Sequence, residues 1–249
     1  MIFEAADKMK NFEAGIFNIL DDKRKELESQ GRKIYNFSVG TPDFEPEEHI
    51  MKAVSEACLH PENYRYALSD RDELLEAVIR RYKHRYHTDI AKNEIMSVYG
   101  SQEGMTHIFL PLINPGDVVL LPNPGYPIFN TGAFVAQASQ WLYPLTEEND
   151  YLPDLAAIPE DVRRAAKVMV VSYPANPICK TAPDSFYEEL ITFARENEIL
   201  IIHDNAYSDI IYDGREGKSF LSFPGAKEVG MEFYSLSKSY NYTGARMSF

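Results

Sequence analysis

The sequence contains few residues of several kinds that mark particular classes of protein. It holds 2 cysteines in 249 residues, Cys58 and Cys179, which are far apart and show no metal-site spacing. Lysine and arginine total 25 against 38 acidic residues, so the formal net charge is −13. Nucleic-acid phosphates are bound by a basic face, which so acidic a chain is not expected to offer. We therefore expect no metal centre and no nucleic-acid partner.

Long apolar runs, internal repeats and low-complexity linkers are also missing. No apolar run approaches the length of a membrane-spanning helix, so no membrane partner is expected. Met1 is followed directly by a segment of mixed charge, which together with the scarce cysteines predicts a cytoplasmic location. The composition, 45% hydrophobic and 25% charged, is typical of a globular protein with a sizeable core.

Apolar periodicity predicts the order of helices and strands. Amphipathic patterns predict helices over residues 11–30, 46–59, 72–87, 102–113 and 183–197. Short apolar runs predict strands over residues 95–99, 118–121, 168–172, 199–203 and 232–235. Strands and helices alternate from residue 94 onward, which is typical of a mostly parallel sheet covered by helices. We therefore expect an α/β fold.

Ligands of such sheets bind beyond the carboxyl ends of the strands, so the residues just after each apolar run are candidates. Gly100, Ser101 and Gln102 follow the first predicted strand and open a helix, where free backbone N–H groups favour an anion. A plain helix cap is the alternative there. Tyr126 follows the next strand on a proline-rich turn and is suited to stacking on a flat ring. A tyrosine packed under a loop is the alternative.

Three more candidates follow the next two predicted strands. Asn176 stands between prolines, where its amide can donate to a phenolate oxygen or simply form a turn. Asp204 ends an apolar strand, where a carboxylate is costly unless it is paired. Its partner is either a protonated ring nitrogen or a set of backbone N–H groups. Tyr207 comes one turn later, within reach of the same ring.

The final segment carries Lys238 among hydroxyl side chains, with Arg246 eight positions later. An amine that forms a Schiff base needs neighbours that bind a phosphate and hold a ring. Ser235, Ser237 and Arg246 offer the first kind of neighbour. Taken alone, the segment is also compatible with a solvated basic turn.

In this order and placement, the motifs resemble those of class I aminotransferases, enzymes that depend on pyridoxal 5′-phosphate (PLP). The resemblance runs from Phe37 onward and includes residues 114–117 and 122–127. Residues 149–155 and 220–226 are similar to the branch that contains LL-diaminopimelate aminotransferases. The resemblance implies a three-layer αβα PLP-binding large domain with a mostly parallel mixed sheet over residues 45–249. Residues 1–44 would form an N-terminal arm and a segment of a small domain.

The resemblance also implies a role for each candidate residue. Lys238 would form the Schiff base with PLP and shuttle a proton, and Asp204 would keep the pyridine nitrogen protonated. Tyr207 and Asn176 would bind the phenolic oxygen, while Tyr126 would stack on the ring. The phosphate-binding candidates are Ser101, Gln102, Ser235, Ser237 and Arg246, with Tyr66 contributed across a homodimer interface. The candidates for contact with the substrate are Gly40 and Asn176.

The chain departs from the family pattern in three places. Residues 176–179 read Asn-Pro-Ile-Cys where the family usually has Asn-Pro-Thr-Gly. Residues 64–70 lack the glycine that usually follows the phosphate-contacting tyrosine, so Tyr64 and Tyr66 both stay candidates. The sequence given also ends before the C-terminal small domain, which carries the arginine for the substrate carboxylate. Residues 1–249 alone are therefore expected to be inactive.

The expected reaction is ping-pong transfer of an amino group from an amino acid to a 2-oxo acid. A PLP-dependent carbon–sulfur β-lyase on the same fold is the alternative among enzymes, because it would use the same lysine and aspartate. A non-catalytic PLP-binding fragment is the alternative from another class. The sequence does not name the amino donor or acceptor.

Overall fold

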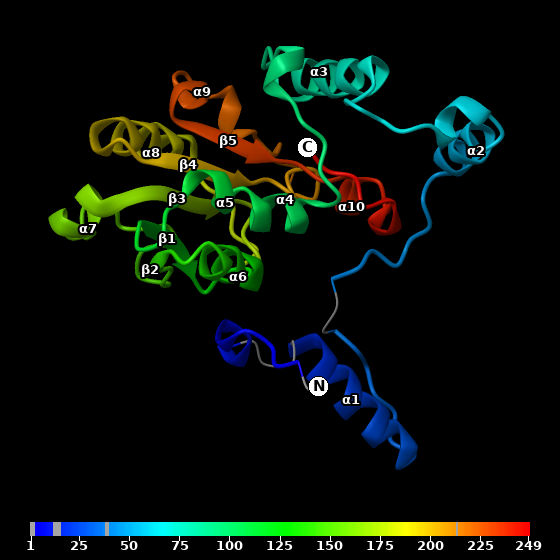
Figure 1. Ribbon diagram of the computed structural model, residues 1–249, viewed down its shortest axis with the longest axis horizontal. Helices are drawn as coiled ribbons and strands as arrows, with labels where there is room; N and C mark the ends of the chain where they lie inside the picture. The colour runs from blue at the N-terminus through cyan, green and yellow to red at the C-terminus, as the bar shows by residue number, and fades with distance from the viewer. Residues whose placement is uncertain (1–2, 12–15, 38–39, 213) are drawn as a thin grey trace. The chain divides into compact units, whose positions relative to one another are not determined.

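The computed structural model describes residues 3–11, 16–37, 40–212 and 214–249. The chain divides into two units, Met1–Asp43 and Phe44–Phe249 (Figure 1). The first unit contains helix α1 (Ile16–Ser29), so the predicted helix over residues 11–30 is confirmed there, and residues 12–15 lie outside the described residues. Ion pairs one turn apart support α1, because Arg24 contacts Asp21 at 2.6 Å and Glu28 at 2.9 Å.

Among the described residues, the second unit holds the remaining α-helices and all the strands. The strands are β1 (Val118–Asn123), β2 (Ser139–Pro144), β3 (Ala166–Ser172), β4 (Leu200–Asp204) and β5 (Gly230–Phe233). The longer helices are α2 (Glu48–Ala57), α3 (Asp72–Tyr86), α6 (Pro127–Val135) and α8 (Asp184–Asn197). The shorter helices are α4 (Ser101–His107), α5 (Phe109–Leu112), α7 (Glu160–Ala165), α9 (Ala226–Val229) and α10 (Leu236–Ser239).

The strands form one sheet in the order β2-β1-β3-β4-β5, and each neighbouring pair is parallel. The chain leaves β1 to form β2 on one side and then returns to form β3 on the other. Such a reversal opens a crevice beyond the carboxyl ends of the two strands. The carboxyl ends of β1 and β3 are therefore the natural ligand position on this sheet.

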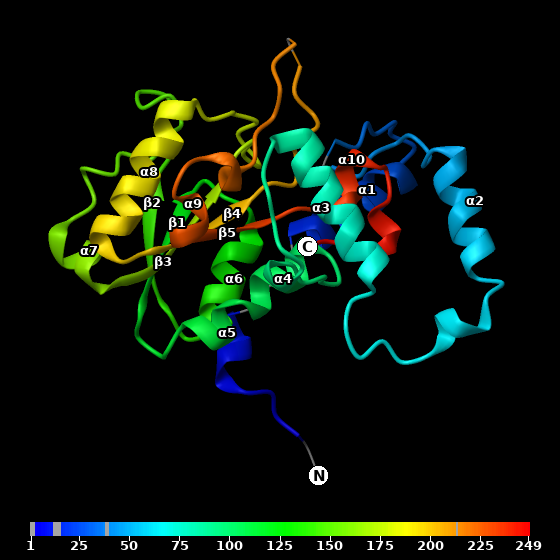
Figure 2. The same cartoon turned by 90° about the horizontal axis from the view of Figure 1, so that it is seen from above.

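Helices cover both faces of the sheet, because successive side chains of a strand point to opposite faces. Leu120 and Met169 pack with side chains of α8 and α9 on one face. Val119 and Val170 pack with α4, α5 and α6 on the other. The four side chains are at most 1% exposed, which explains the continuous apolar runs in the sequence. Figure 2 shows the helices on the two sides, and the predicted three-layer αβα fold is confirmed.

Most predicted helices are present with adjusted ends. The helix over residues 183–197 is confirmed as α8, which has Asp184 in its first turn and Arg195 in its last, as the helix dipole favours. The predicted helices over residues 46–59 and 72–87 are confirmed as α2 and α3. The helical residues predicted over residues 102–113 are present, but they form two helices, α4 and α5, with a break at residue 108. Pro111 has no N–H to bond the carbonyl of His107, so the regular helix stops there.

The strand predicted over residues 95–99 is wrong. The N–H of Ser97 donates to the Asp70 carboxylate at 2.8 Å instead of to a neighbouring strand. Val98 pairs with Ser248 in a single antiparallel bridge, and Gly100 then turns the chain at φ 88° into α4. The backbone hydrogen bonds of this segment are therefore made to the Asp70 side chain and to Ser248, and the apolar pattern of the sequence does not indicate either partner.

The edge strand β2 was not predicted. Its residues are mostly exposed and only Tyr143 is buried, so β2 lacks the apolar run that marks the central strands. The strand predicted over residues 232–235 lies two residues earlier, as β5. Tyr234 instead pairs with Phe249, through N–O distances of 3.0 and 2.9 Å.

Residues 246–249 therefore lie between two other segments of the chain. Ser248 bridges Val98 on one side and Ser235 on the other, in both cases antiparallel. This pairing brings the start of α4, helix α10 and Arg246 together, although they are far apart in the sequence. Within the described residues, no helix combines the length and the apolar character needed to cross a membrane.

Candidate active site

The candidate residues gather at the carboxyl ends of the central strands. Asp204 is the last residue of β4 and lies opposite Ser172, the last residue of β3, in the parallel register. Asn176 and Tyr207 follow these two strands, and α10 with Lys238 follows β5. The geometry below describes how close these groups come.

Asp204 is a buried carboxylate with an incomplete set of partners. Asp204 is 4% exposed, and its Oδ1 atom has no hydrogen-bond partner among the described residues. Burial raises the pKa of Asp204 to about 6, while His203 and the backbone N–H of Ala206 act in the opposite direction. A buried carboxylate in this state gains free energy from a cationic hydrogen-bond donor.

Tyr207 and Asn176 form a polar pair next to Asp204. The Asn176 amide donates to the Tyr207 hydroxyl at 3.4 Å, a long hydrogen bond that leaves both groups able to bind another atom. Burial raises the pKa of Tyr207 to about 12, and the negative charge of Asp204 adds to this rise. Tyr207 therefore stays protonated at neutral pH and can donate a hydrogen bond.

Lys238 lies near the ring of Tyr207. Its Nζ is 6.0 Å from the centroid of that ring. Burial lowers the pKa of Lys238, and the positive charge of Arg246 lowers it further. Its helix α10 is capped by Ser235, whose hydroxyl accepts from the Ser237 N–H at 3.2 Å. A lysine with a lowered pKa is a better nucleophile at neutral pH.

Arg246 lies against the start of α4. Gly100 precedes this helix at φ 88°, and a Cβ at Gly100 would overlap the guanidinium of Arg246. Only glycine therefore suits this position, for both the backbone angle and the space. Arg246 itself is exposed and donates from Nη1 to the Thr243 carbonyl at 3.0 Å. Ser101 and Gln102 begin α4 directly after Gly100.

Tyr126 precedes Pro127, the first residue of α6. Its ring meets that of Phe129 edge-on, with centroids 6.0 Å apart. Burial raises the pKa of Tyr126, Asp204 raises it further, and Arg246 lowers it. Tyr126 therefore lies close enough to Asp204 and Arg246 for their charges to affect its pKa.

Tyr64 and Tyr66, the two candidates for the phosphate contact, are exposed. Tyr66 is 98% exposed and Tyr64 is 74% exposed. The Tyr64 hydroxyl donates to the Cys58 carbonyl at 2.8 Å. Gly40 belongs to the first unit, so its role stays a prediction.

Sequence reasoning missed Ser172 and Asp209. Ser172 is 6% exposed and lies beside Asp204 on the neighbouring strand. Its position at the end of an apolar run was the signal in the sequence that could have identified it. Asp209 lies two residues after Tyr207 and contacts side chains from distant segments. Its partners come from residues 81 to 239, so no local pattern in the sequence could indicate them.

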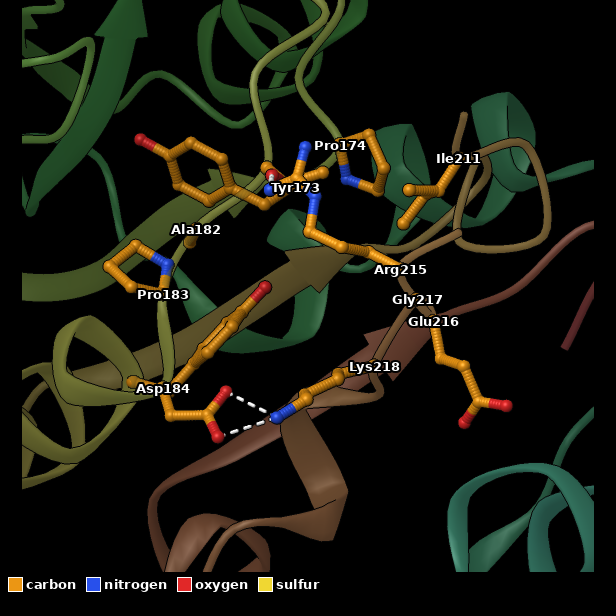
Figure 3. A pocket seen from close by; sticks show the side chains of 12 residues that line it. Tyr173, Pro174, Ala182, Pro183, Asp184, Ile211, Arg215, Glu216, Gly217 and Lys218 are labelled. Atoms are coloured by element: carbon orange, nitrogen blue, oxygen red, sulfur yellow. Dashed lines mark hydrogen bonds and ion pairs between the residues drawn. The ribbon is translucent and has the colours of Figure 1, made fainter. Parts of the chain in front are cut away.

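Two hollows border the cluster without containing Asp204 or Lys238. One, of about 320 Å³, lies between residues 173–187 and residues 211–218 (Figure 3). Asp184 and Lys218 point toward each other there, with both carboxylate oxygens 2.5 Å from Nζ. The other, of about 350 Å³, includes Asn176 and Tyr207 in its wall. The cluster stays the candidate site, because Asp204 and Lys238 line neither hollow.

Comparison with known proteins identifies the family of this chain. The family of class I and II aminotransferases matches residues 32–249, and the chain belongs to this family. The LL-diaminopimelate aminotransferase of Syntrophobacter fumaroxidans is 39% identical over 251 residues, covering 100% of this chain and 65% of that protein. That of Halothermothrix orenii is 41% identical over 246 residues, covering 98% and 63%.

Among solved structures, BacF from Bacillus subtilis is 38% identical with a TM-score of 0.94, covering 100% of this chain and 63% of BacF. The chain therefore spans somewhat less than two thirds of the length of these relatives. The predicted family and the similarity to its LL-diaminopimelate branch are confirmed. PLP, the predicted cofactor, is the cofactor of this class.

Proposed function

We propose that the protein containing this chain is a PLP-dependent aminotransferase that moves an amino group between an amino acid and a 2-oxo acid. The observation that carries the proposal is the position of Lys238 and Asp204, both close to Tyr207. Lys238 Nζ lies 6.0 Å from the ring of Tyr207, and Asp204 is close enough to raise the pKa of the same hydroxyl. A buried acid and an amine with a lowered pKa thus share one site.

The residues present fit PLP. Oδ1 of Asp204 is buried and has no hydrogen-bond partner among the described residues, so a protonated ring nitrogen would supply the missing donor. Tyr207 and Asn176 would hold the phenolic oxygen, and Tyr126 would lie against the ring. The phosphate would be held by Ser101, Gln102, Ser235, Ser237 and Arg246, as the proximity of Arg246 to the start of α4 supports.

When bound, PLP supplies an electron sink that stabilises negative charge at the substrate Cα. The residues of the chain then have separate tasks. Asp204 would keep its carboxylate charged against the ring nitrogen, which favours the cationic form of that nitrogen. Lys238 would hold the cofactor covalently and, once released by the substrate, would carry a proton at Nζ. Tyr207 donates a hydrogen bond, because its pKa of about 12 keeps it protonated at neutral pH.

The names of the relatives suggest which substrate to test first. The two relatives from Syntrophobacter fumaroxidans and Halothermothrix orenii are named LL-diaminopimelate aminotransferases, and one solved structure, from Thermus thermophilus, is described as a probable N-succinyldiaminopimelate aminotransferase. We include LL-diaminopimelate and related amino acids in the proposal as donors. Gly40 and Asn176 are proposed to contact the substrate.

A homodimer and a cytoplasmic location belong to the same proposal. In a dimer with shared active sites, Tyr66 would reach the phosphate of the partner subunit. The exposure of Tyr66, 98%, leaves its ring available for such a contact. The scarcity of cysteine supports the cytoplasm.

The experiment that tests the proposal uses the complete natural protein loaded with PLP. Addition of an amino acid without a 2-oxo acid should change the visible absorbance once, and addition of a 2-oxo acid should reverse it. Release of ammonia and pyruvate from a sulfur-containing amino acid, with no acceptor present, would favour the β-lyase. No change with any amino acid would contradict both activities.

A further inference from the structure

Asp209 lies at the centre of a second polar cluster, which is distinct from the cofactor candidates. Its Oδ2 accepts from Arg81 Nη2 and from the Ser239 hydroxyl at 2.5 Å each, and from the Tyr234 hydroxyl at 2.8 Å. Its Oδ1 accepts from Arg85 Nε at 3.2 Å. We call these five residues the Asp209 cluster.

The Asp209 cluster joins parts of the chain that are far apart in sequence. Arg81 and Arg85 come from α3, Tyr234 follows β5, and Ser239 is the last residue of α10. The side chains of Arg81 and Asp209 are 19% and 20% exposed, so the ion pair is largely shielded from water. Arg81 also lies over the Tyr234 ring, with Cζ 4.3 Å from its centroid. One carboxylate therefore holds three elements together.

Two of these contacts lie next to the candidate active site. Ser239 directly follows Lys238 in α10. Asp209 lies in the same turn as Tyr207, because the Ile210 N–H donates to the Tyr207 carbonyl at 2.9 Å. The bond between Ser239 and Asp209 thus links the turn that carries Lys238 to the turn that carries Tyr207.

Helix α10 depends on such contacts, because it has 4 residues and a single helical turn does not hold itself in water. At its start, Ser235 caps the helix and bridges Ser248. At the end of α10, the Ser239 hydroxyl donates to Asp209. Arg81, which also binds Asp209, donates from Nη1 to the hydroxyl of the next residue, Tyr240, at 3.0 Å. The position of the Lys238 backbone is therefore set from both ends.

We propose that Asp209 is a positioning residue: through Ser239 it fixes the turn of Lys238 against the ring of Tyr207, and so holds the amine in its half-buried place. The proposal rests on the proposed function, since it concerns the lysine that would bind PLP. Asp209 touches neither cofactor nor substrate in this scheme. Without its hold on Ser239, α10 would loosen and the amine would move toward water and away from Arg246.

The test is a pH titration of the visible absorbance of the PLP-loaded, complete protein. Ser239→Ala removes one hydroxyl and keeps the fold, and Asp209→Asn removes the charge. Both changes should raise the midpoint of the absorbance transition by about one pH unit, because this midpoint reports protonation of the Lys238 nitrogen in the loaded protein. Burial and the charge of Arg246, which lower the pKa of the free amine, disfavour a positive charge on that nitrogen only while it stays in place. The melting temperature is measured alongside.

Matched controls come from polar contacts that do not reach α10. Ser222→Ala removes a hydroxyl that donates at 2.6 Å to the Ser219 carbonyl. Asp184→Asn removes a carboxylate that pairs with Lys218 at 2.5 Å. Both controls should keep the wild-type midpoint within roughly 0.3 pH units, since exposed pairs of this kind contribute little.

The outcomes separate the two proposals. If wild-type protein does not carry PLP on Lys238 after borohydride reduction, the proposed function fails. If it does, and Ser239→Ala and Asp209→Asn leave the midpoint unchanged or lower it, the positioning role is overturned. A lower melting temperature with an unchanged midpoint also overturns it, because that result describes a purely structural carboxylate.

Discussion

Asp204 and Asp209 lie five residues apart on one stretch of chain and have opposite surroundings. Asp204 is 4% exposed, has an oxygen without a hydrogen-bond partner among the described residues, and has a pKa raised by burial to about 6. Asp209 is also largely buried, yet hydrogen bonds from Ser239 and Tyr234 and the charge of Arg81 keep its pKa below the ordinary value. The first is left incomplete and the second is fully satisfied.

The contrast between the two carboxylates matches the two roles proposed for them, Asp204 in binding a ligand and Asp209 in supporting the site. An incomplete carboxylate costs the folded protein free energy until a ligand completes it. A satisfied one holds its neighbours in place and offers nothing to a ligand. The two should therefore respond in opposite ways to the loss of their charge, which the following predictions use.

The largest expected effect comes from Lys238→Ala. Activity of the complete protein should fall by about 10³-fold or more, because the amine of Lys238 is the group proposed to carry the proton. Thermal stability of the cofactor-free protein should stay within about 1 kcal/mol of the wild-type value, since the Lys238 side chain is only half-buried. Steady-state kinetics and calorimetry check the two parts. If Lys238→Ala kept more than a tenth of wild-type activity, the catalytic role proposed for Lys238 would be wrong.

Asp204→Asn should lower activity by about 10² to 10³-fold while keeping the fold, because the variant no longer holds a negative charge against the ring nitrogen. It should also stabilise the cofactor-free protein. The folded pKa of about 6 lies above the ordinary value of 3.8, so the folded state binds the proton more tightly. Stability is then lost as pH rises from about 4 to 6, and at pH 8 the loss is about 2–3 kcal/mol.

The variant has no carboxyl to ionise, so its advantage should be present at pH 8 and absent at pH 4. Denaturant unfolding at both pH values measures it. A variant that is less stable than wild type at pH 8 would show that Asp204 has the partners that a structural aspartate needs.

Asp209→Asn should have the opposite sign and lower the stability by about 2 kcal/mol at pH 8, because Arg81 and Arg85 lose their anion. Here the folded pKa lies below the ordinary value of 3.8, so the stabilisation is present above pH 4 and disappears as pH falls further. The same unfolding experiment applies, with Asp184→Asn as the control, which should cost less than about 0.5 kcal/mol. If Asp209→Asn and Asp184→Asn lowered the stability equally, Asp209 would contribute no more to the fold than an exposed ion pair.

The smallest effect on stability is expected from Tyr207→Phe. The hydrogen bond from Asn176 is 3.4 Å long, so its loss should cost less than about 1 kcal/mol. Activity should nevertheless fall by about 10-fold, because the hydroxyl is proposed to bind the cofactor. A variant with unchanged kinetics and a large loss of stability would show that the pair is structural.

The sequence predicted the parts of the fold that depend on local pattern. Continuous apolar runs located β1, β3 and β4, because central strands of a parallel sheet are buried on both faces. The same logic pointed to Asp204, at the end of such a run. It failed for β2, an edge strand with one buried residue, and for residues 95–99, whose backbone bonds Asp70 and Ser248.

Contacts between distant segments were beyond reach for a different reason. The place of Arg246 against Gly100 follows from the bridges of Ser248, and such bridges depend on tertiary pairing. The Asp209 cluster likewise joins α3, the turn after β4 and α10. For Lys238 and Arg246, resemblance to a family supplied the candidates that local pattern left ambiguous.

The most direct test of the central claim is reduction of the PLP-loaded, complete protein with borohydride, followed by proteolysis and mass mapping. The site at the strand ends predicts one pyridoxyl group per chain, on Lys238, and its absence after Lys238→Ala. A pyridoxyl group spread over surface lysines, or found in equal amount after Lys238→Ala, would contradict the assignment of this site.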